Sequence, residues 1–472
     1  MWSAADAFLG QGVTFLVGII LARILSPDEY GLIGICLIFN TVLNGIVDSG
    51  FSNALIRKAE VNNEEYNTMF LTNMVVSAFL YILLFFSTPF VASFFNRLEL
   101  IPLLRVTGLI LIFNALSITQ VTILTKRIDF KTKTKASLIS AIISGIIGVV
   151  MAFCNLGVWA LVGQMVSKSF IYTLCLWLLN KWLPNFSFSQ SSFKYMWGFG
   201  WKMLVSGLLN NVWNQLYQVV VGKYYAPITL GHYTRAKEYA TIFSGNITSI
   251  IERVSFPVLA EIQNDKSRLI AAYRKVIKTT MFITSICMFG LGAISEPMVY
   301  CLIGPKWHQA ATFLPLICIS MSLYPLHAIN LNMLKVQGRS DIFLYLEIIK
   351  KIIALVPIGV GIFIGIYWML IASIIVGIIS FFLNSYHTGK DLGYSSWQQI
   401  KDVAPGFTVA LCVAFPVYFL KYMSISYWLI LPLQILVGLV ILVVVCILSK
   451  NAEFSELKNM LMPLFNKAIK RK

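Results

Sequence analysis

Charged residues are scarce in this sequence, and the motifs of the common enzyme classes are absent from it. Only 12% of the 472 residues are charged. No G-x-x-x-x-G-K-S/T, G-x-S-x-G or H-E-x-x-H pattern occurs, so the usual phosphate loop, nucleophile elbow and zinc-protease site are excluded. The eight cysteines lie in apolar segments without a C-x-x-C pair, and we expect small buried residues there rather than metal or redox ligands. We therefore predict a protein that is not an enzyme and holds no metal or cofactor.

Hydrophobic residues, in contrast, make up 58% of the chain, which is more than a soluble core can bury. A helix needs about 20 apolar residues to cross the hydrocarbon layer of a bilayer. We predict about fourteen such spans, near residues 4–24, 31–52, 67–88, 100–122, 136–154, 157–179, 198–221, 231–257, 279–303, 310–332, 342–364, 366–386, 403–421 and 425–448. The expected fold class is an all-α, polytopic membrane protein.

The formal charge of +17 is distributed along the chain and does not form one basic patch, which argues against nucleic acid as a partner. Most of the 37 lysines and arginines lie in alternate connections and in the C-terminal tail. Basic residues collect on the cytoplasmic side of membrane proteins. We therefore expect both termini in the cytoplasm, and a basic amphipathic tail at residues 450–472 that lies on the inner leaflet.

An internal repeat divides the chain. Residues 22–31 read ARILSPDEYG and residues 222–231 read GKYYAPITLG, so each copy has a basic residue, a proline four positions later and a glycine four beyond that. Proline and glycine are suited to a reversal between two membrane helices, and repeats of hydrophobic helices are typical of secondary transporters. The expected parts are an N-lobe at 1–180, a connector at 181–197, a C-lobe at 198–388, two extra helices at 389–449 and the tail.

Polar side chains inside the predicted spans are the candidate binding residues, because each is costly in hydrocarbon. The seventh span carries five amides at three- and four-residue spacing, which places them on one face: Asn210, Asn211, Asn214, Gln215 and Gln218. The equivalent face of the first span carries Gln11 and Thr14. One interpretation is a polar cavity between the two spans for a hydrophilic cargo; the alternative is interhelical hydrogen bonding without any cargo.

Charged side chains inside spans are mostly basic, which suits phosphate oxygens. Lys168 lies near the middle of its span, too deep to reach either interface easily, whereas snorkelling is as good an account of Arg253. Asp48 and the Glu252–Arg253 pair close two equivalent spans on the same side. They are a candidate salt-bridge gate, or each caps its own helix.

Several ordered motifs give a family resemblance. Residues 21–31, the sequence DSGF at 48–51, and the second-half sequences GHYTRA at 231–236 and FPVLAEIQND at 256–265 resemble bacterial polysaccharide transporters of the Wzx flippase type. These transporters belong to the multidrug/oligosaccharidyl-lipid/polysaccharide exporter superfamily, and the colanic-acid exporter branch is the most similar. The resemblance implies two six-helix bundles plus two extra helices, and transport of an undecaprenyl-diphosphate-linked oligosaccharide between leaflets of the bacterial inner membrane.

The resemblance also implies site residues and partners. In the related peptidoglycan-precursor flippase, arginines on the first, second and eighth helices line a cationic cavity; by position, Arg23 and Arg253 correspond here. The second span has Asp48 and no interior arginine, so Lys168 or Lys350 is expected to substitute. Polymerases and glycosyltransferases are the expected protein partners, and coupling to Na⁺ or H⁺ stays open. The alternatives are a cation-coupled drug antiporter of the same superfamily, a scramblase or lipid-polymer synthase, and a membrane scaffold without transport activity.

Overall fold

The structure is a computed structural model that describes residues 10–48, 50–456 and 458–459, apart from the side chains of residues 252–254, 256, 340 and 391. The described residues form helices joined by short connections, with no strand among them, so the predicted all-α class is confirmed. Each of the fourteen predicted spans falls on one helix or on two consecutive helices, although the first begins before the described residues. Most of the predicted tail lies outside them.

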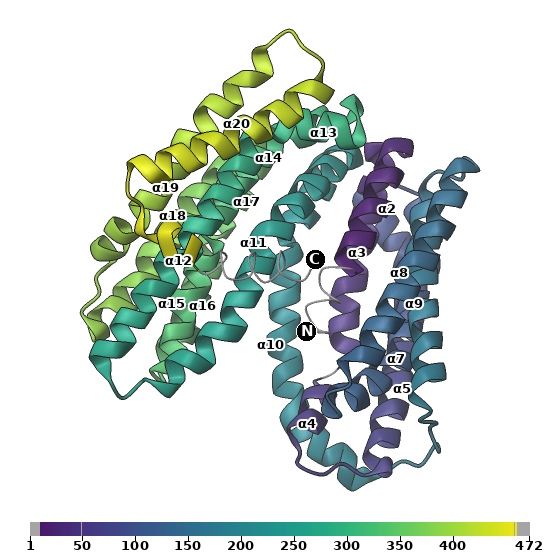
Figure 1. The fold of residues 1–472 in the computed structure, drawn as a ribbon. Helices are drawn as coiled ribbons and strands as arrows, with labels where there is room; N and C mark the ends of the chain where they lie inside the picture. Colours follow the sequence, from purple (N-terminus) through teal and green to yellow (C-terminus); the bar gives the residue numbers. More distant parts are fainter. Residues whose placement is uncertain (1–9, 49, 457, 460–472) are drawn as a thin grey trace, which may run out of the picture. The chain divides into compact units, whose positions relative to one another are not determined.

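Packing divides the chain into two compact units, residues 1–234 and 235–472. The helices of the first unit are α2 (Gln11–Ile24), α3 (Pro27–Val47), α4 (Phe51–Arg57), α5 (Asn63–Phe95), α6 (Leu100–Thr107), α7 (Leu109–Lys126), α8 (Phe130–Phe153), α9 (Val158–Asn180), α10 (Gln190–Tyr224) and the first two turns of α11 (Pro227–Glu261), as Figure 1 shows. Within this unit α3 is central, because it contacts α5, α6, α7, α9 and α10.

The second unit contains the rest of α11 and the remaining helices. They are α12 (Lys266–Ala293), α13 (Ser295–Ile303), η2 (Pro305–Trp307), α14 (His308–Ser322), α15 (Tyr324–Val336), α16 (Ser340–Ile353), α17 (Leu355–Phe363), α18 (Ile366–Leu392), α19 (Ser396–Phe419), η3 (Leu420–Tyr422) and α20 (Tyr427–Leu448). The two C-terminal helices are integral to this unit, since α19 packs along α12 and α20 packs on α19 and α13.

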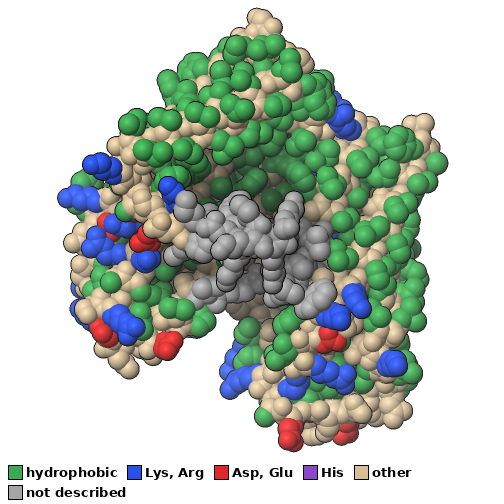
Figure 2. All heavy atoms as spheres, in the orientation of Figure 1, with side chains coloured by type: hydrophobic (Ala, Val, Ile, Leu, Met, Phe, Trp, Pro, Cys, Tyr) green, Lys and Arg blue, Asp and Glu red, His purple; other side chains and the backbone are tan. Residues whose placement is uncertain are grey.

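Ten stretches of the described chain are helical, long and apolar enough to cross a membrane. The four other predicted spans fall on α2, α10, α11 and the α16–α17 pair. The protein is therefore a multi-pass membrane protein, and fourteen crossings stay a prediction. Figure 2 shows hydrophobic side chains over the visible flanks of each unit. Most of the visible Lys and Arg side chains of each unit gather toward one of its ends.

Four predicted spans are each interrupted at a single residue. The breaks lie at Gly108 between α6 and α7, at Ile294 between α12 and α13, at Leu323 between α14 and α15, and at Ala354 between α16 and α17. Pro297, Pro325 and Pro357 lie in the first turn after three of these breaks. Proline has no N–H to donate to the preceding turn, and it is tolerated in the first turn of a new helix.

The connection between α9 and α10 is short and held against the first unit. It covers residues 181–189, because α10 begins at Gln190, earlier than the predicted start of its span. Gln120 on α7 donates to the Trp182 carbonyl at 2.9 Å, and Asn67 on α5 accepts from the Asn185 N–H at 3.1 Å. α10 then packs on α3, α4 and α5. Judged by its packing, α10 belongs to the first unit. The predicted lobes were drawn from the sequence repeat, which places α10 in the second lobe, and this division stays a prediction.

Among the cysteines, Cys36, Cys301, Cys318 and Cys446 are buried, as predicted. Cys154 and Cys412 are exposed, which corrects that prediction for these two positions. Cys154 follows the last residue of the apolar helix α8 and Cys412 lies on the apolar helix α19, where hydrophobicity marks a surface that can face lipid as well as a protein core.

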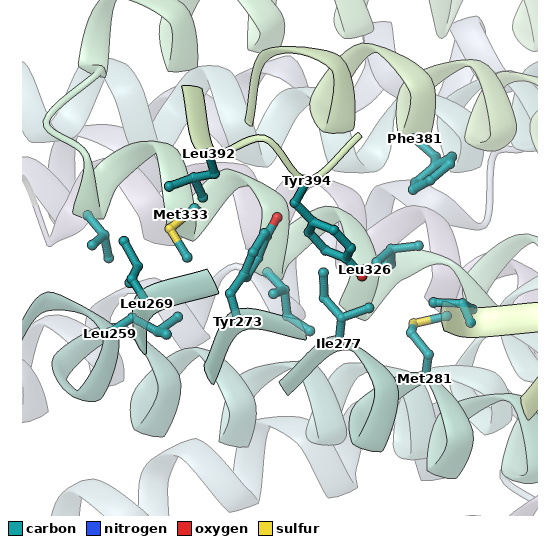
Figure 3. Close-up of a cluster of buried hydrophobic side chains, with 13 residues drawn as sticks. Leu259, Leu269, Tyr273, Ile277, Met281, Leu326, Met333, Phe381, Leu392 and Tyr394 are labelled. Atoms are coloured by element: carbon teal, nitrogen blue, oxygen red, sulfur yellow. The ribbon is translucent and has the colours of Figure 1, made fainter. Parts of the chain in front are cut away.

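A large hydrophobic cluster of the second unit joins α11, α12, α15, α18 and α19 (Figure 3). Its buried side chains include Leu259, Tyr273, Ile277, Met333 and Phe381. The Tyr273 hydroxyl donates to Asn330 Oδ1 at 2.7 Å, and Asn330 exchanges two hydrogen bonds with Gln399 of α19. A satisfied polar group inside an apolar cluster fixes the register of the helices that share it.

A carboxylate beside this cluster holds α19 to α12. Asp402 accepts two hydrogen bonds from Arg274, at 2.8 and 2.9 Å, and one from Tyr394 at 2.7 Å, and Lys278 lies 3.2 Å from it. Burial, together with the hydrogen bond to Asp402, raises the pKa of Tyr394 above its ordinary value, so the phenol remains a donor. The Asp402 side chain is only 9% exposed, so it depends on these donors.

We expect Asp402→Ala to destabilise the protein by about 1–3 kcal/mol, because removing it leaves Arg274 and Lys278 unpaired; their partial exposure keeps the cost below that of a fully buried pair. Thermal unfolding of the purified protein in detergent measures the change. The control is Glu456→Ala, which breaks an exposed pair with Lys275 and should change stability by less than about 0.5 kcal/mol. Equal melting temperatures for the two variants would contradict the assignment.

Candidate functional site

The two copies of the repeat meet at the start of α3 and α11. Ser26 caps α3 in a capping box with Glu29, and a proline opens each helix, Pro27 on α3 and Pro227 on α11. A Cβ on Gly31 would lie 1.9 Å from the Pro227 carbonyl oxygen, and a Cβ on Gly231 would lie 1.9 Å from that of Pro27. Because both glycines lack a side chain, the two backbones touch reciprocally. The sequence predicted the repeat but not this contact.

Lys168 lies near the middle of α9, and its ammonium group contacts the first helix. Lys168 Nζ lies 3.4 Å from the Thr14 hydroxyl oxygen on α2, and that hydroxyl donates to the Gly10 carbonyl at 3.0 Å. By helix rise, Lys168 is about 15 Å from the nearer end of α9. Among the described residues no carboxylate lies within ion-pair distance of it. The structure thus brings two predicted site residues together around an ammonium group without an acidic partner.

Next to Lys168 in the sequence, a line of polar side chains joins three helices. Asn114 on α7 donates to Asn44 Oδ1 on α3 at 2.7 Å, and the Ser169 hydroxyl on α9 donates to Asn114 Oδ1 at 2.8 Å. Thr173 on α9 donates to the Phe113 carbonyl at 2.8 Å. The sequence did not predict these residues, because isolated asparagines and serines do not form a stripe. The four-residue spacing of Ser169 and Thr173 on α9 is the only signal that could have indicated them. They hold α3, α7 and α9 in register around Lys168.

The predicted amide stripe on α10 is divided between two roles. Asn211 is half-buried against α3, where a Cβ on Gly45 would lie 2.4 Å from its Nδ2. Asn214 is exposed, while Gln215 and Gln218 are half-buried, and the Gln215 Oε1 has no hydrogen-bond partner among the described residues. Asn211 therefore lies in the α3–α10 packing, whereas the Asn214 side chain is exposed. Contact of these residues with a cargo stays a prediction.

The other predicted residues lie apart from Lys168. Gln11 and Arg23 are exposed at opposite ends of α2. Lys350 forms an ion pair with Glu347 one turn away on α16, in the second unit. The Asp48 carboxylate accepts from the Ser52 hydroxyl of α4 at 2.5 Å, and its predicted role in a gate stays a prediction. The side chains of Glu252 and Arg253 lie outside the described residues, and so do the predicted gate pairing and the Arg253 phosphate contact.

The first unit therefore presents chemistry for binding an anion with hydroxyl groups attached. An ammonium group without an acidic partner attracts phosphate or carboxylate oxygens, and exposed amides can donate to and accept from hydroxyls. No group of three or more His, Cys, Asp or Glu side chains able to hold a metal ion is present among the described residues.

Comparisons with known proteins relate this chain to polysaccharide biosynthesis and transport proteins. A family model described as polysaccharide biosynthesis protein matches residues 20–312, more than half of the chain. The succinoglycan biosynthesis transport protein ExoT of Rhizobium meliloti is 25% identical over 74% of this chain and 71% of its own length. The lipopolysaccharide biosynthesis protein WzxC of Escherichia coli is 24% identical over 84% of this chain and 82% of its own length, and the teichuronic acid biosynthesis protein TuaB of Bacillus subtilis is 26% identical over 64% and 62%.

Solved structures share the fold. The lipid II flippase MurJ in an inward closed conformation aligns with a TM-score of 0.72 at 17% identity, over 95% of this chain and 98% of its own. An inward-facing multidrug resistance MATE family transporter of the MOP superfamily aligns with a TM-score of 0.61 at 14% identity, over 83% and 99%. The resemblance seen in the sequence motifs is confirmed. The chain belongs to the polysaccharide biosynthesis protein family and has the fold of MOP-superfamily transporters.

Proposed function

We propose that the protein moves an undecaprenyl-diphosphate-linked oligosaccharide from the inner to the outer leaflet of the bacterial inner membrane by alternating access. The cargo is a repeat unit of O-antigen, capsule or exopolysaccharide. Relatives named for succinoglycan, lipopolysaccharide and teichuronic acid biosynthesis support the polysaccharide role, and a lipid II flippase of the same fold supports a lipid-linked cargo. In this proposal the protein is a transporter and not a catalyst.

The observation that carries the proposal is Lys168 in the interior of the first unit. No carboxylate among the described residues pairs with this lysine, and a charge at that depth is costly unless an anion or water meets it. A diphosphate provides that anion, and the exposed amide of Asn214 can bind sugar hydroxyls. A drug or cation antiporter would instead need an acidic side chain in this place. Arg23, Arg253 and Lys350 remain proposed as further diphosphate contacts, and Gln11, Thr14, Asn211, Gln215 and Gln218 as sugar contacts.

We place both termini in the cytoplasm, since the lysines and arginines of the connections favour that side. The end of the first unit that carries α4 is then cytoplasmic, and the turn at Pro27 is on the outer side. With the cell interior negative, a cargo carrying about two negative charges gains about 2.3 kcal/mol per charge for each 100 mV on moving outward. The membrane potential is therefore sufficient to favour export without a cofactor, and coupling to Na⁺ or H⁺ stays open.

The supplying and consuming reactions define the protein partners. Glycosyltransferases must build the lipid-linked unit on the inner leaflet, and a polymerase must use it on the outer leaflet. A chromosomal neighbourhood with genes for both activities is the expected context. The phospholipid bilayer is the remaining partner, and no nucleic acid is involved.

Deletion of the gene in its host, followed by complementation, tests the function. We expect lipid-linked oligosaccharide to accumulate on the inner leaflet of the deletion strain, where an impermeant glycosidase added to spheroplasts cannot digest it. Wild-type protein supplied from a plasmid should restore digestion. Full accessibility of the oligosaccharide in the deletion strain, in the absence of another transporter gene, would contradict the proposal.

A further inference from the structure

α10 is much longer than a membrane crossing requires, and its surplus is at one end. Its 35 residues span about 52 Å, against about 30 Å of hydrocarbon. The Tyr224 end is level with the end of α5, because Gly222 packs against Phe95, the last residue of α5. About twenty residues back from Tyr224, the helix reaches the opposite hydrocarbon boundary near Met203. The segment from Gln190 to that point extends beyond the hydrocarbon.

A polar line begins at that boundary. Lys202, Ser206, Asn210 and Asn214 follow one another at four-residue spacing, so they share one face of α10, and all four side chains are exposed. Gly200, which lies across the helix from Lys202, is buried, and the start of α4 packs closely against α10 there. Exposed amides and an ammonium group are not stable against hydrocarbon. This face of α10 therefore meets water or a polar ligand.

Lys202 differs from two nearby lysines of the first unit, Lys58 and Lys126, which have polar partners. Lys58 pairs with Glu65, and Lys126 donates to the Leu55 carbonyl at 3.2 Å. Lys202 Nζ contacts only the Trp201 ring, 6.0 Å from its centroid, among the described residues. Its ammonium group retains all three donors for a ligand. It is also the only basic side chain on the polar line.

We propose that Lys202 captures the diphosphate of the cargo at the inner hydrocarbon boundary, and that Ser206, Asn210 and Asn214 provide hydrogen-bond partners for the attached sugars along α10. This inference rests on the proposed function, and it assigns the first contact of the cargo to a residue outside the predicted site. A diphosphate carried by a membrane lipid arrives at the boundary depth of its leaflet, which is the depth of Lys202.

Binding of defined lipids to the purified full-length protein, measured by native mass spectrometry, tests the inference. The probes are undecaprenyl diphosphate, undecaprenol, which lacks phosphate, and phosphatidylglycerol, which represents bulk anionic lipid. We expect Lys202→Gln to weaken undecaprenyl diphosphate binding about tenfold and to leave undecaprenol binding unchanged. Lys202→Arg should bind within about twofold of wild type, because the charge and donors remain at the same depth.

Lys401→Gln is the matched control. Lys401 is also exposed and also lies 6.0 Å from a tryptophan ring, that of Trp397, but it belongs to α19 in the second unit. It should bind all three lipids as wild type does. Gel filtration and circular dichroism confirm that each variant is folded before binding is measured.

The outcomes separate this inference from the proposed function. Wild-type protein that prefers undecaprenyl diphosphate, together with an equally selective Lys202→Gln, overturns the role of Lys202 and leaves the function standing. Wild-type protein that binds undecaprenol as tightly as undecaprenyl diphosphate contradicts the proposed function itself. An equal loss of phosphatidylglycerol binding in Lys202→Gln would show a contact with bulk lipid and would also overturn the capture role.

Discussion

Gly31→Ala should destabilise the protein by at least about 2 kcal/mol, although the substitution adds a single methyl group. The new Cβ would lie 1.9 Å from the Pro227 carbonyl oxygen, a distance that two non-bonded atoms cannot adopt. Relief requires α3 and the first turns of α11 to move apart along their backbones, since no flexible side chain can move away. Thermal unfolding in detergent, together with the yield of monodisperse protein, measures the effect.

Reciprocity makes this prediction specific. Gly231→Ala should destabilise the protein by a similar amount, because its Cβ would meet the Pro27 carbonyl oxygen at the same distance. The double variant should cost less than the sum, since either methyl group alone already separates the helices. Gly377→Ala on α18 is the control: no atom lies within 4 Å of its added Cβ, so alanine should be neutral or slightly stabilising. Additive losses in the double variant would argue against direct backbone contact.

Lys168→Met is expected to reduce export about 10- to 100-fold while leaving the protein as stable as wild type or more stable. Export falls because the diphosphate loses its cation inside the first unit. Stability does not fall, since methionine removes a charge that has no carboxylate partner among the described residues and keeps most of the volume. Glycosidase accessibility in the complemented deletion strain gives the export rate, and thermal unfolding gives the stability.

The opposite changes of activity and stability separate a binding role from a structural one. If Lys168 serves only to hold α9 to α2 through Thr14, Lys168→Met should lower the melting temperature, and export should fall only as far as the amount of folded protein falls. Lys194→Ala, which removes an exposed lysine from α10, is the control and should change neither quantity. Normal export by well-folded Lys168→Met would remove Lys168 from the site.

Hydrophobic patterning was sufficient to predict the helices but not their ends. Apolar residues stop where the bilayer stops, whereas α10 begins at Gln190 and α11 ends at Glu261, so hydropathy underestimates helices that continue into water. The breaks at Leu323 and Ala354 lie inside continuous apolar runs, and only the nearby prolines mark them. The predicted span on α10 is less apolar than the ten spanning stretches, and it carries the amide line.

Part of the candidate site could be predicted from the sequence, because polar residues stand out in apolar spans. A lysine near mid-span is conspicuous in a sequence because burying its charge is costly, and the structure places Lys168 against Thr14. Which amide on α10 faces outward was not predictable, since Asn211 and Asn214 differ by less than one helical turn. Their roles depend on where α3 packs, and Gly45 places Asn211 in that interface. Pairing between Asn44, Asn114 and Ser169 likewise depends on three helices far apart in the sequence.

Transport by the purified protein in sealed liposomes tests the central claim most directly. Undecaprenyl-diphosphate-linked oligosaccharide is loaded, and its arrival at the opposite leaflet is followed with an impermeant glycosidase. The account predicts transfer by wild-type protein without added nucleotide or cation gradient, faster when the destination side is positive, and slow transfer by Lys168→Met. Wild-type protein that is folded and inserted but leaves the oligosaccharide on its original leaflet at every potential would contradict the account.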